Sequence, residues 1–157
     1  MFVEQWFMYH KMELGFDDTT DKNAQNILNA YAPDKCRYFG SQKAGSKMRD
    51  NWDKDNQVRH TVMLTGLRHK YQQNPLLAQV LVESGDRLLV ENVSFDSYWG
   101  NGKDGEGANK LGLCNMIVRE EIRTNELAVF EESNFMSLNY LFGKMHNGKE
   151  KGTKKKA

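Results

Sequence analysis

Hydrophobic positions along this chain recur mainly at helical spacing. In residues 3–16, Val3, Phe7, His10 and Leu14 fall three or four residues apart, which places them on one face of a helix. Proline, glycine and polar residues divide the remaining pattern into further expected helices at 22–31, 33–39, 55–73, 75–85 and 108–124. Two short segments, 87–93 and 127–130, are instead typical of strands. The pattern therefore predicts a mostly helical chain with one or two short strands.

Two charged residues flank the apolar face of the first expected helix. At about 100° per residue, Glu4 and Lys11 lie on the shoulder of that face, two turns apart, and point in the same direction. This position is the edge of the core, where the wall of a cleft would lie. The same spacing also describes an ordinary solvated charge pair on an amphipathic helix.

A glycine-rich segment, FDSYWGNGKDGEG, follows the expected strand at 87–93. Asp96 stands where that strand leaves the sheet, and Trp99 comes three residues later. The glycines lead to the start of the helix at 108–124, where backbone N–H groups around Gly107 and Asn109 favour phosphate. A flexible surface loop is the alternative interpretation.

Trp52 is unusual because it lies in a polar segment, SQKAGSKMRDNWDKD. It could stack on a ligand ring or fill the core. Cys36 and Cys114 form no CxxC pair and have no His at ligand spacing, so two buried thiols are expected and no metal site.

Composition indicates one soluble domain, because 157 residues with 39% hydrophobic and 27% charged residues suffice for a single core. Residues 144–157 hold six Lys and one Glu, a charge of +5, so the remainder carries 1 − 5 = −4. We expect a domain at 1–143 and a disordered basic tail at 144–157, which could contact nucleic acid or serve as a solubilising terminus. Without an apolar run of about 20 residues, a cytoplasmic protein with no membrane contact is expected.

Four segments, in order, match motifs of a known family. VEQWFMYHK resembles S-V-E-H-Y-F-Q-A-Q-K, and APDKCRYFG resembles A-x-P-x-x-A-K-x-x-G with Arg37 where Lys is usual. The third segment, KYQQNPLLAQVLVESGDRLLVENVSFDSYWGNG, resembles K-F-x-Q-N-P-x-L-x-x-x-L-L-x-T-G-D-x-x-L-V-E-A-S-x-x-D-x-x-W-G. The fourth, GANKLGLCNMIVREEI, resembles G-x-N-x-L-G-x-x-L-M-x-V-R. Over about residues 3–123 the chain thus resembles the YbiA/NADAR family of N-glycosidases.

The resemblance implies an α+β fold that is mostly helical, a YbiA-like fold with a small β-sheet. It also implies hydrolysis of an N-glycosidic bond with no metal and no cofactor. The sequence does not decide which carboxylate does which job, and we expect Glu4 near the leaving base and Asp96 at the sugar. Trp52 and Trp99 would sandwich or wall the leaving heterocycle. Carried over by motif, the catalytic residues are Glu4, Trp52, Asp96 and Trp99, and the substrate-binding residues are Lys11, Arg37, Gly107 and Asn109.

The family's known substrates are small phosphorylated ribosyl compounds of two kinds. One kind is a riboflavin-pathway intermediate, a ribosylamino-pyrimidine with a 5′-phosphate, and the other is ADP-ribose attached to guanine. Nucleic acid would enter only as an ADP-ribosylated substrate or through the basic tail. The rival hypothesis is a nucleotide or ADP-ribose binding module without turnover.

The chain departs from the family at its front, because only three residues precede Glu4. Family members usually carry a longer segment there, which includes F-x-S-N-F-x-P and two short strands. Ser133-Asn134-Phe135 lies near the other end, so residues 127–142 could supply the strands in a circularly permuted order. A truncation, or a start at an internal Met, is the alternative, and each would give a fold altered at the N-terminus.

Overall fold

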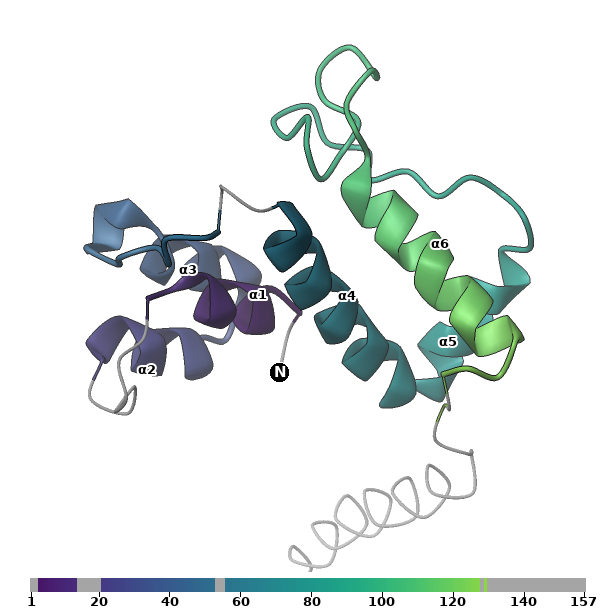
Figure 1. Cartoon of the computed structure of the whole chain (residues 1–157), viewed down its shortest axis with the longest axis horizontal. Helices are drawn as coiled ribbons and strands as arrows, with labels where there is room; N and C mark the ends of the chain where they lie inside the picture. The colour runs from purple at the N-terminus through teal and green to yellow at the C-terminus, as the bar shows by residue number, and fades with distance from the viewer. Residues whose placement is uncertain (1–2, 14–20, 53–55, 128, 130–157) are drawn as a thin grey trace, which may run out of the picture.

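The computed structural model describes residues 3–13, 21–52, 56–127 and 129. The helices there are α1 (Val3–Lys11), α2 (Lys22–Leu28), α3 (Pro33–Phe39), the 3-10 turn η2 (Gln42–Ala44), α4 (Asn56–Gln72), α5 (Pro75–Glu83) and α6 (Lys110–Arg123). Helix α4 runs through the middle, with α1–α3 on one side and α5–α6 on the other (Figure 1). Because α4 packs against both α1 and α6, it joins the two groups.

The helix boundaries follow local signals that the sequence already displayed. Asp21 begins α2 by accepting a 2.8 Å hydrogen bond from the N–H of Ala24. Pro33 and Pro75 stand at the starts of α3 and α5, where the missing N–H costs nothing. The expected helices are therefore confirmed, with ends shifted by a few residues.

The first helix is shorter than expected. It ends at Lys11, and Met12 then forms an isolated antiparallel bridge with Met48. Residue 14 and those following in the expected helix at 3–16 lie outside the described residues.

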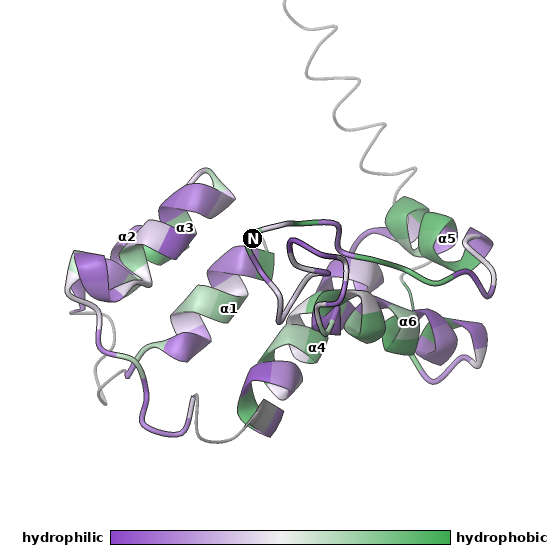
Figure 2. Ribbon diagram, turned by 90° about the horizontal axis from the view of Figure 1, so that it is seen from above, coloured by the Kyte–Doolittle hydropathy of each residue, from purple (hydrophilic) through white to green (hydrophobic). Residues whose placement is uncertain are grey.

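Buried side chains from α1–α6 form one continuous core. The spacing in residues 55–73 predicts one helix face with His60, Leu64, Leu67 and Tyr71. Leu67 and Tyr71 are buried, whereas His60 and Leu64 are partly buried, and Val118 of α6 is completely buried. Helix α5 is the most uniformly hydrophobic helix (Figure 2), and it buries Ala78 and Leu81. The core thus lies on both sides of α4.

Gln5, a buried polar residue, fastens α1 to the end of α2. Its side-chain Nε2 lies 3.1, 3.1 and 3.0 Å from the carbonyl oxygens of Ile27, Leu28 and Ala30. The last carbonyls of a helix have no i+4 partner within it, and this amide donates to carbonyls at and just beyond the end of α2. Gln5 thereby holds the helix that carries Glu4.

The expected small β-sheet is absent from the described part of the chain. Residues 87–93 are extended but form no strand, and in 127–130 the two described residues, 127 and 129, form none either. The segment instead bonds to Asn109, whose Oδ1 accepts from the N–H of Glu91 at 2.9 Å and whose Nδ2 donates to the carbonyl of Leu89 at 2.8 Å. One side-chain amide thus takes the place that a neighbouring strand would occupy.

Close packing fixes this extended segment against α6. A Cβ atom at Gly112 would lie 2.2 Å from the carbonyl oxygen of Leu89, so only glycine permits the approach. The loop that follows residue 93 is thereby held over the start of α6.

Three sequence-based expectations fall outside the described residues. They are the boundary at 143, the basic tail at 144–157, and the permuted placement of nearly all of 127–142, and each stays a prediction. In the part that is described, no helix has the length and apolar character to cross a membrane.

Candidate active site

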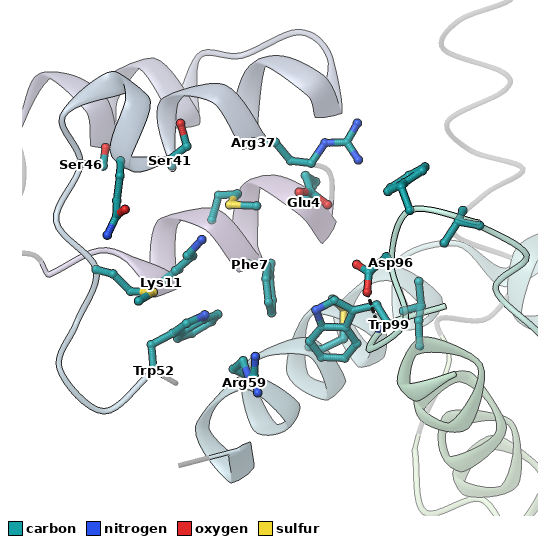
Figure 3. A pocket seen from close by; sticks show the side chains of 18 of the residues that line it. Glu4, Phe7, Lys11, Arg37, Ser41, Ser46, Trp52, Arg59, Asp96 and Trp99 are labelled. Atoms are coloured by element: carbon teal, nitrogen blue, oxygen red, sulfur yellow. Dashed lines mark hydrogen bonds between the residues drawn. The ribbon is translucent and has the colours of Figure 1, made fainter. Parts of the chain in front are cut away.

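A cavity of about 780 Å³ opens between α1, α3, η2, α4 and the loop at 91–99. It contains six of the eight residues singled out from the sequence: Glu4, Lys11, Arg37, Trp52, Asp96 and Trp99. Figure 3 shows that these side chains come from both sides of the molecule, Glu4 and Lys11 from α1 and Asp96 and Trp99 from the loop. Side chains far apart in sequence therefore share one pocket.

Glu4 lies in the first turn of α1, and its carboxyl group is partly buried. Burial raises the pKa of Glu4, while the nearby charges of Arg37 and Lys11 lower it in part, so that the net shift is upward. A carboxyl group with a raised pKa stays protonated to higher pH and is suited to donate a proton.

Asp96 is held in a tight turn by its own loop. Its Oδ1 accepts the backbone N–H groups of Tyr98 at 2.9 Å and Trp99 at 2.8 Å. Among the described residues no hydrogen bond engages Oδ2, so one oxygen of the carboxyl group is available to a ligand. Figure 3 shows Asp96 and Glu4 on facing walls of the cavity.

The aromatic residues form a wall, with Phe7 between the two indoles. The ring of Phe7 packs edge-on against Trp52, with centroids 4.9 Å apart, and against Trp99 at 5.4 Å. Because Phe7 separates the indoles in this row, they do not face each other as a sandwich. Trp52 is also a core residue, since only 2% of it is exposed.

Positive charge gathers on the wall made by α1, α3 and η2. Lys11, Arg37 and Lys43 line the cavity there, and Arg59 joins them from α4. Lys43 and Arg59 were not singled out from the sequence. A signal existed for Lys43, because the stretch 35–49 contains five basic residues and no acidic one. The acidic side chains of Glu4, Glu91 and Asp96 also line the cavity.

Gly107 and Asn109, expected to bind phosphate, do not line this cavity. The N–H of Gly107 donates to the carbonyl of Asn101 at 2.7 Å, and that of Asn109 donates to Gly100 at 3.0 Å. Since these donors are used within the loop, and the Asn109 amide holds residues 89–91, the two residues stabilise the loop. A phosphate there would have to displace these hydrogen bonds.

A search of the described residues finds no group of three or more His, Cys, Asp or Glu side chains arranged to hold a metal ion. Cys36 and Cys114 are free and buried, as the sequence predicted. Burial raises the pKa of both thiols.

The raised pKa of Glu4 predicts a pH-dependent effect on stability. The folded state favours the protonated carboxyl, so this contribution is complete below the unfolded pKa and is lost as pH rises through the folded pKa. Glu4→Gln should therefore raise Tm above the wild-type value at about pH 8, and the difference should vanish at about pH 4. Calorimetry at both pH values measures this, with Glu13→Gln, an exposed carboxyl just beyond α1, as the matched control. An unchanged difference at the two pH values would contradict the prediction.

The chain is similar in sequence to known proteins. The family model described as "NADAR domain" matches residues 1–123. An N-glycosidase of Nostoc punctiforme is 40% identical over 122 residues, which cover 77% of this chain and 73% of that protein. A riboflavin biosynthesis protein of Vibrio vulnificus is 44% identical over 66 residues, covering 42% of this chain and 18% of that protein.

The chain is also similar to YbiA of Escherichia coli, in sequence and in structure. N-glycosidase YbiA is 31% identical over 102 residues, which cover 65% of this chain and 61% of that protein. The match therefore spans less than two thirds of the curated YbiA proteins. The NMR structure of E. coli YbiA superposes with a TM-score of 0.66 at 28% identity, and the match covers 82% of this chain and 71% of that one.

Proposed function

Because the chain belongs to the NADAR domain family, we propose that it is an N-glycosidase acting on a phosphorylated ribosyl compound. The bond cleaved joins C1 of the ribose to a nitrogen of the leaving base. The relatives named N-glycosidase support this activity, and the relative named as a riboflavin biosynthesis protein supports a substrate of that pathway.

The observation that carries the proposal is the pair of carboxyl groups on facing walls of one cavity, Glu4 and Asp96 (Figure 3). Cleavage of the C1–N bond leaves positive charge on the ribose, which a fixed carboxylate stabilises. Asp96 is fixed by two backbone N–H groups, so it suits that role. Glu4, with its raised pKa, donates a proton to the leaving nitrogen.

Water completes the reaction. Its oxygen adds to C1 of the ribose and its proton is taken up by a carboxylate, so the products are the free amine and the ribosyl hydroxyl compound. The aromatic wall of Trp52, Phe7 and Trp99 contacts the leaving heterocycle and excludes bulk water from the bond that breaks.

The cationic wall supplies the specificity for phosphate. Lys11, Arg37 and Lys43 line the same cavity as the two carboxyl groups. Such side chains bind phosphate oxygens, Arg through two parallel hydrogen bonds and Lys as a point charge. Both a ribosylamino-pyrimidine 5′-phosphate and an ADP-ribosylated guanine present phosphate to this wall.

Incubation of the purified protein with each substrate class tests the proposal. Mass spectrometry should detect the released base and the matching ribosyl product from one of the two classes. If calorimetry detects binding but no product forms after long incubation, the protein is a binding module and not an enzyme. The absence of both product and binding would refute the proposal.

A further inference from the structure

Asp96 reaches α4 through the residue two positions along, Tyr98. The backbone N–H of Tyr98 donates to Asp96 Oδ1 at 2.9 Å, while its hydroxyl lies 2.9 Å from Nε2 of His60. His60 belongs to α4 and follows Arg59, which lines the cavity. A single residue thus links the carboxyl group of the loop to the central helix.

The aromatic rings around this link are closely packed. The Tyr98 and His60 rings lie parallel, with centroids 5.7 Å apart and 13° between their planes. Trp99 packs edge-on against both rings, at 5.1 Å from Tyr98 and 5.7 Å from His60. The guanidinium of Arg59 lies 4.1 Å from the centroid of the Tyr98 ring. The ring therefore contacts groups that themselves line the cavity, Trp99 and Arg59.

The His60 side chain is suited to accept the tyrosine hydroxyl. Burial, with Lys110 and Arg59 nearby, lowers the pKa of His60. A neutral imidazole carries one nitrogen that accepts a hydrogen bond. The hydroxyl of Tyr98 can then donate to Nε2 near neutral pH.

The other hydrogen bonds of this turn lead elsewhere. The N–H groups of Ala108, Lys110 and Leu111 donate to the carbonyls of Ser97, Tyr98 and Trp99 at 2.7, 3.0 and 3.0 Å. They attach the turn to the start of α6. Glu4, however, lies on α1, which packs against α4. Helix α6 also packs against α4, and Trp99 packs on Phe7 of α1, so the hydrogen bond between Tyr98 and His60 is one of the contacts that set the relative placement of the two carboxyl groups.

We propose that Tyr98 and His60 are positioning residues, whose hydrogen bond aligns the Asp96 carboxylate with Glu4 across the cavity. The proposal rests on the proposed function, because that function gives the alignment its chemical role. The Tyr98 ring also packs against the guanidinium of Arg59, which lines the cavity. Both residues act through their neighbours, since neither is required to touch the substrate.

Tyr98→Phe is the sharpest test, since it removes only the hydroxyl and keeps the ring, the backbone N–H and the packing on Arg59. We expect kcat to fall about tenfold while KM changes less than about twofold, because misplacement of a reacting group affects the transition state more than binding. His60→Leu should have the same effect, and the double variant should lose no more than either single one. His60→Gln should keep most of the kcat that His60→Leu loses, because the amide of Gln can accept a hydrogen bond from the Tyr98 hydroxyl.

Tyr31→Phe is the matched control, because Tyr31 is 81% exposed and distant in sequence from the turn. It should leave kcat unchanged. A second readout, the ¹³C resonance of the Asp96 carboxyl carbon, should move in Tyr98→Phe and His60→Leu but not in Tyr31→Phe. This resonance needs no turnover, so it decides the proposal even if the wild-type protein hydrolyses no substrate and the proposed function fails. An unmoved Asp96 resonance in Tyr98→Phe, or a wild-type kcat in that variant, overturns the proposal. This holds even if the Tm of the variant is lower than that of the wild type.

Discussion

Replacement of Glu4 by Gln should reduce N-glycosidase activity by about 10³-fold, within the range that general acids contribute. Gln has the size of Glu and cannot donate an acidic proton to the leaving nitrogen. The upward shift of the Glu4 pKa, which burial causes, keeps the carboxyl protonated to higher pH than an exposed one. The initial rate of base release, followed by mass spectrometry or absorbance, measures the effect on kcat.

The pH dependence gives a second view of the same residue. If Glu4 acts as the acid, wild-type kcat falls as pH rises through its raised pKa, and Glu4→Gln lacks this limb. Glu13→Gln, on an exposed residue close in sequence, should retain the wild-type rate and profile. Equal rates for Glu4→Gln and the wild type would remove Glu4 from the mechanism.

Replacement of Asp96 by Asn should lower kcat by about 10²- to 10³-fold, the loss seen when one electrostatic group of a transition state is removed. The amide oxygen of Asn can still accept the N–H groups of Tyr98 and Trp99, so the turn keeps its hydrogen bonds. The variant therefore tests the negative charge by itself. KM should change little, because the positive charge on the ribose develops only in the transition state.

Two companion variants separate charge from architecture. Asp104→Asn alters an exposed carboxyl in the same region and should leave kcat unchanged. Asp96→Ala removes the acceptor as well as the charge, so it should lower Tm in addition to kcat, whereas Asp96→Asn should lower kcat alone. A wild-type kcat in Asp96→Asn would contradict the proposal that the Asp96 charge stabilises the ribose in the transition state.

Local signals in the sequence determined most of the helices. Asp21, Pro33 and Pro75 act within one turn of the chain, so their effect does not depend on what lies elsewhere. The helical period of residues 55–73 predicts that His60, Leu64, Leu67 and Tyr71 share a face, and of these Leu67 and Tyr71 are buried.

The missing strands show where local signals fail. Residues 87–93 have a strand-like composition and are extended, but a sheet needs partners, and the Asn109 amide takes that place. Nothing near Asn109 in sequence indicated this contact, which spans 18 and 20 residues. Its position before a helix predicted that Asn109 binds phosphate, whereas its side chain bonds to residues 89 and 91.

The candidate site likewise has features that follow from the sequence and features that depend on tertiary packing. The family motifs proposed Glu4, Trp52, Asp96 and Trp99, and all four line one cavity. Spacing alone left Glu4 indistinguishable from a solvated surface charge. Its partial burial and raised pKa arise from the packing of other elements around α1, and those elements are remote along the chain.

The family, most helix boundaries and the acidic and aromatic residues proposed for the site follow from the amino-acid sequence. Only the tertiary structure placed Phe7 between the two indoles, brought Lys43 and Arg59 to the cavity, and tied Tyr98 to His60. The physical reason is the range of the forces involved. Capping and helical periodicity act between residues a few positions apart, whereas burial, electrostatic neighbours and hydrogen bonds across the cavity depend on how α4 joins the two groups of helices.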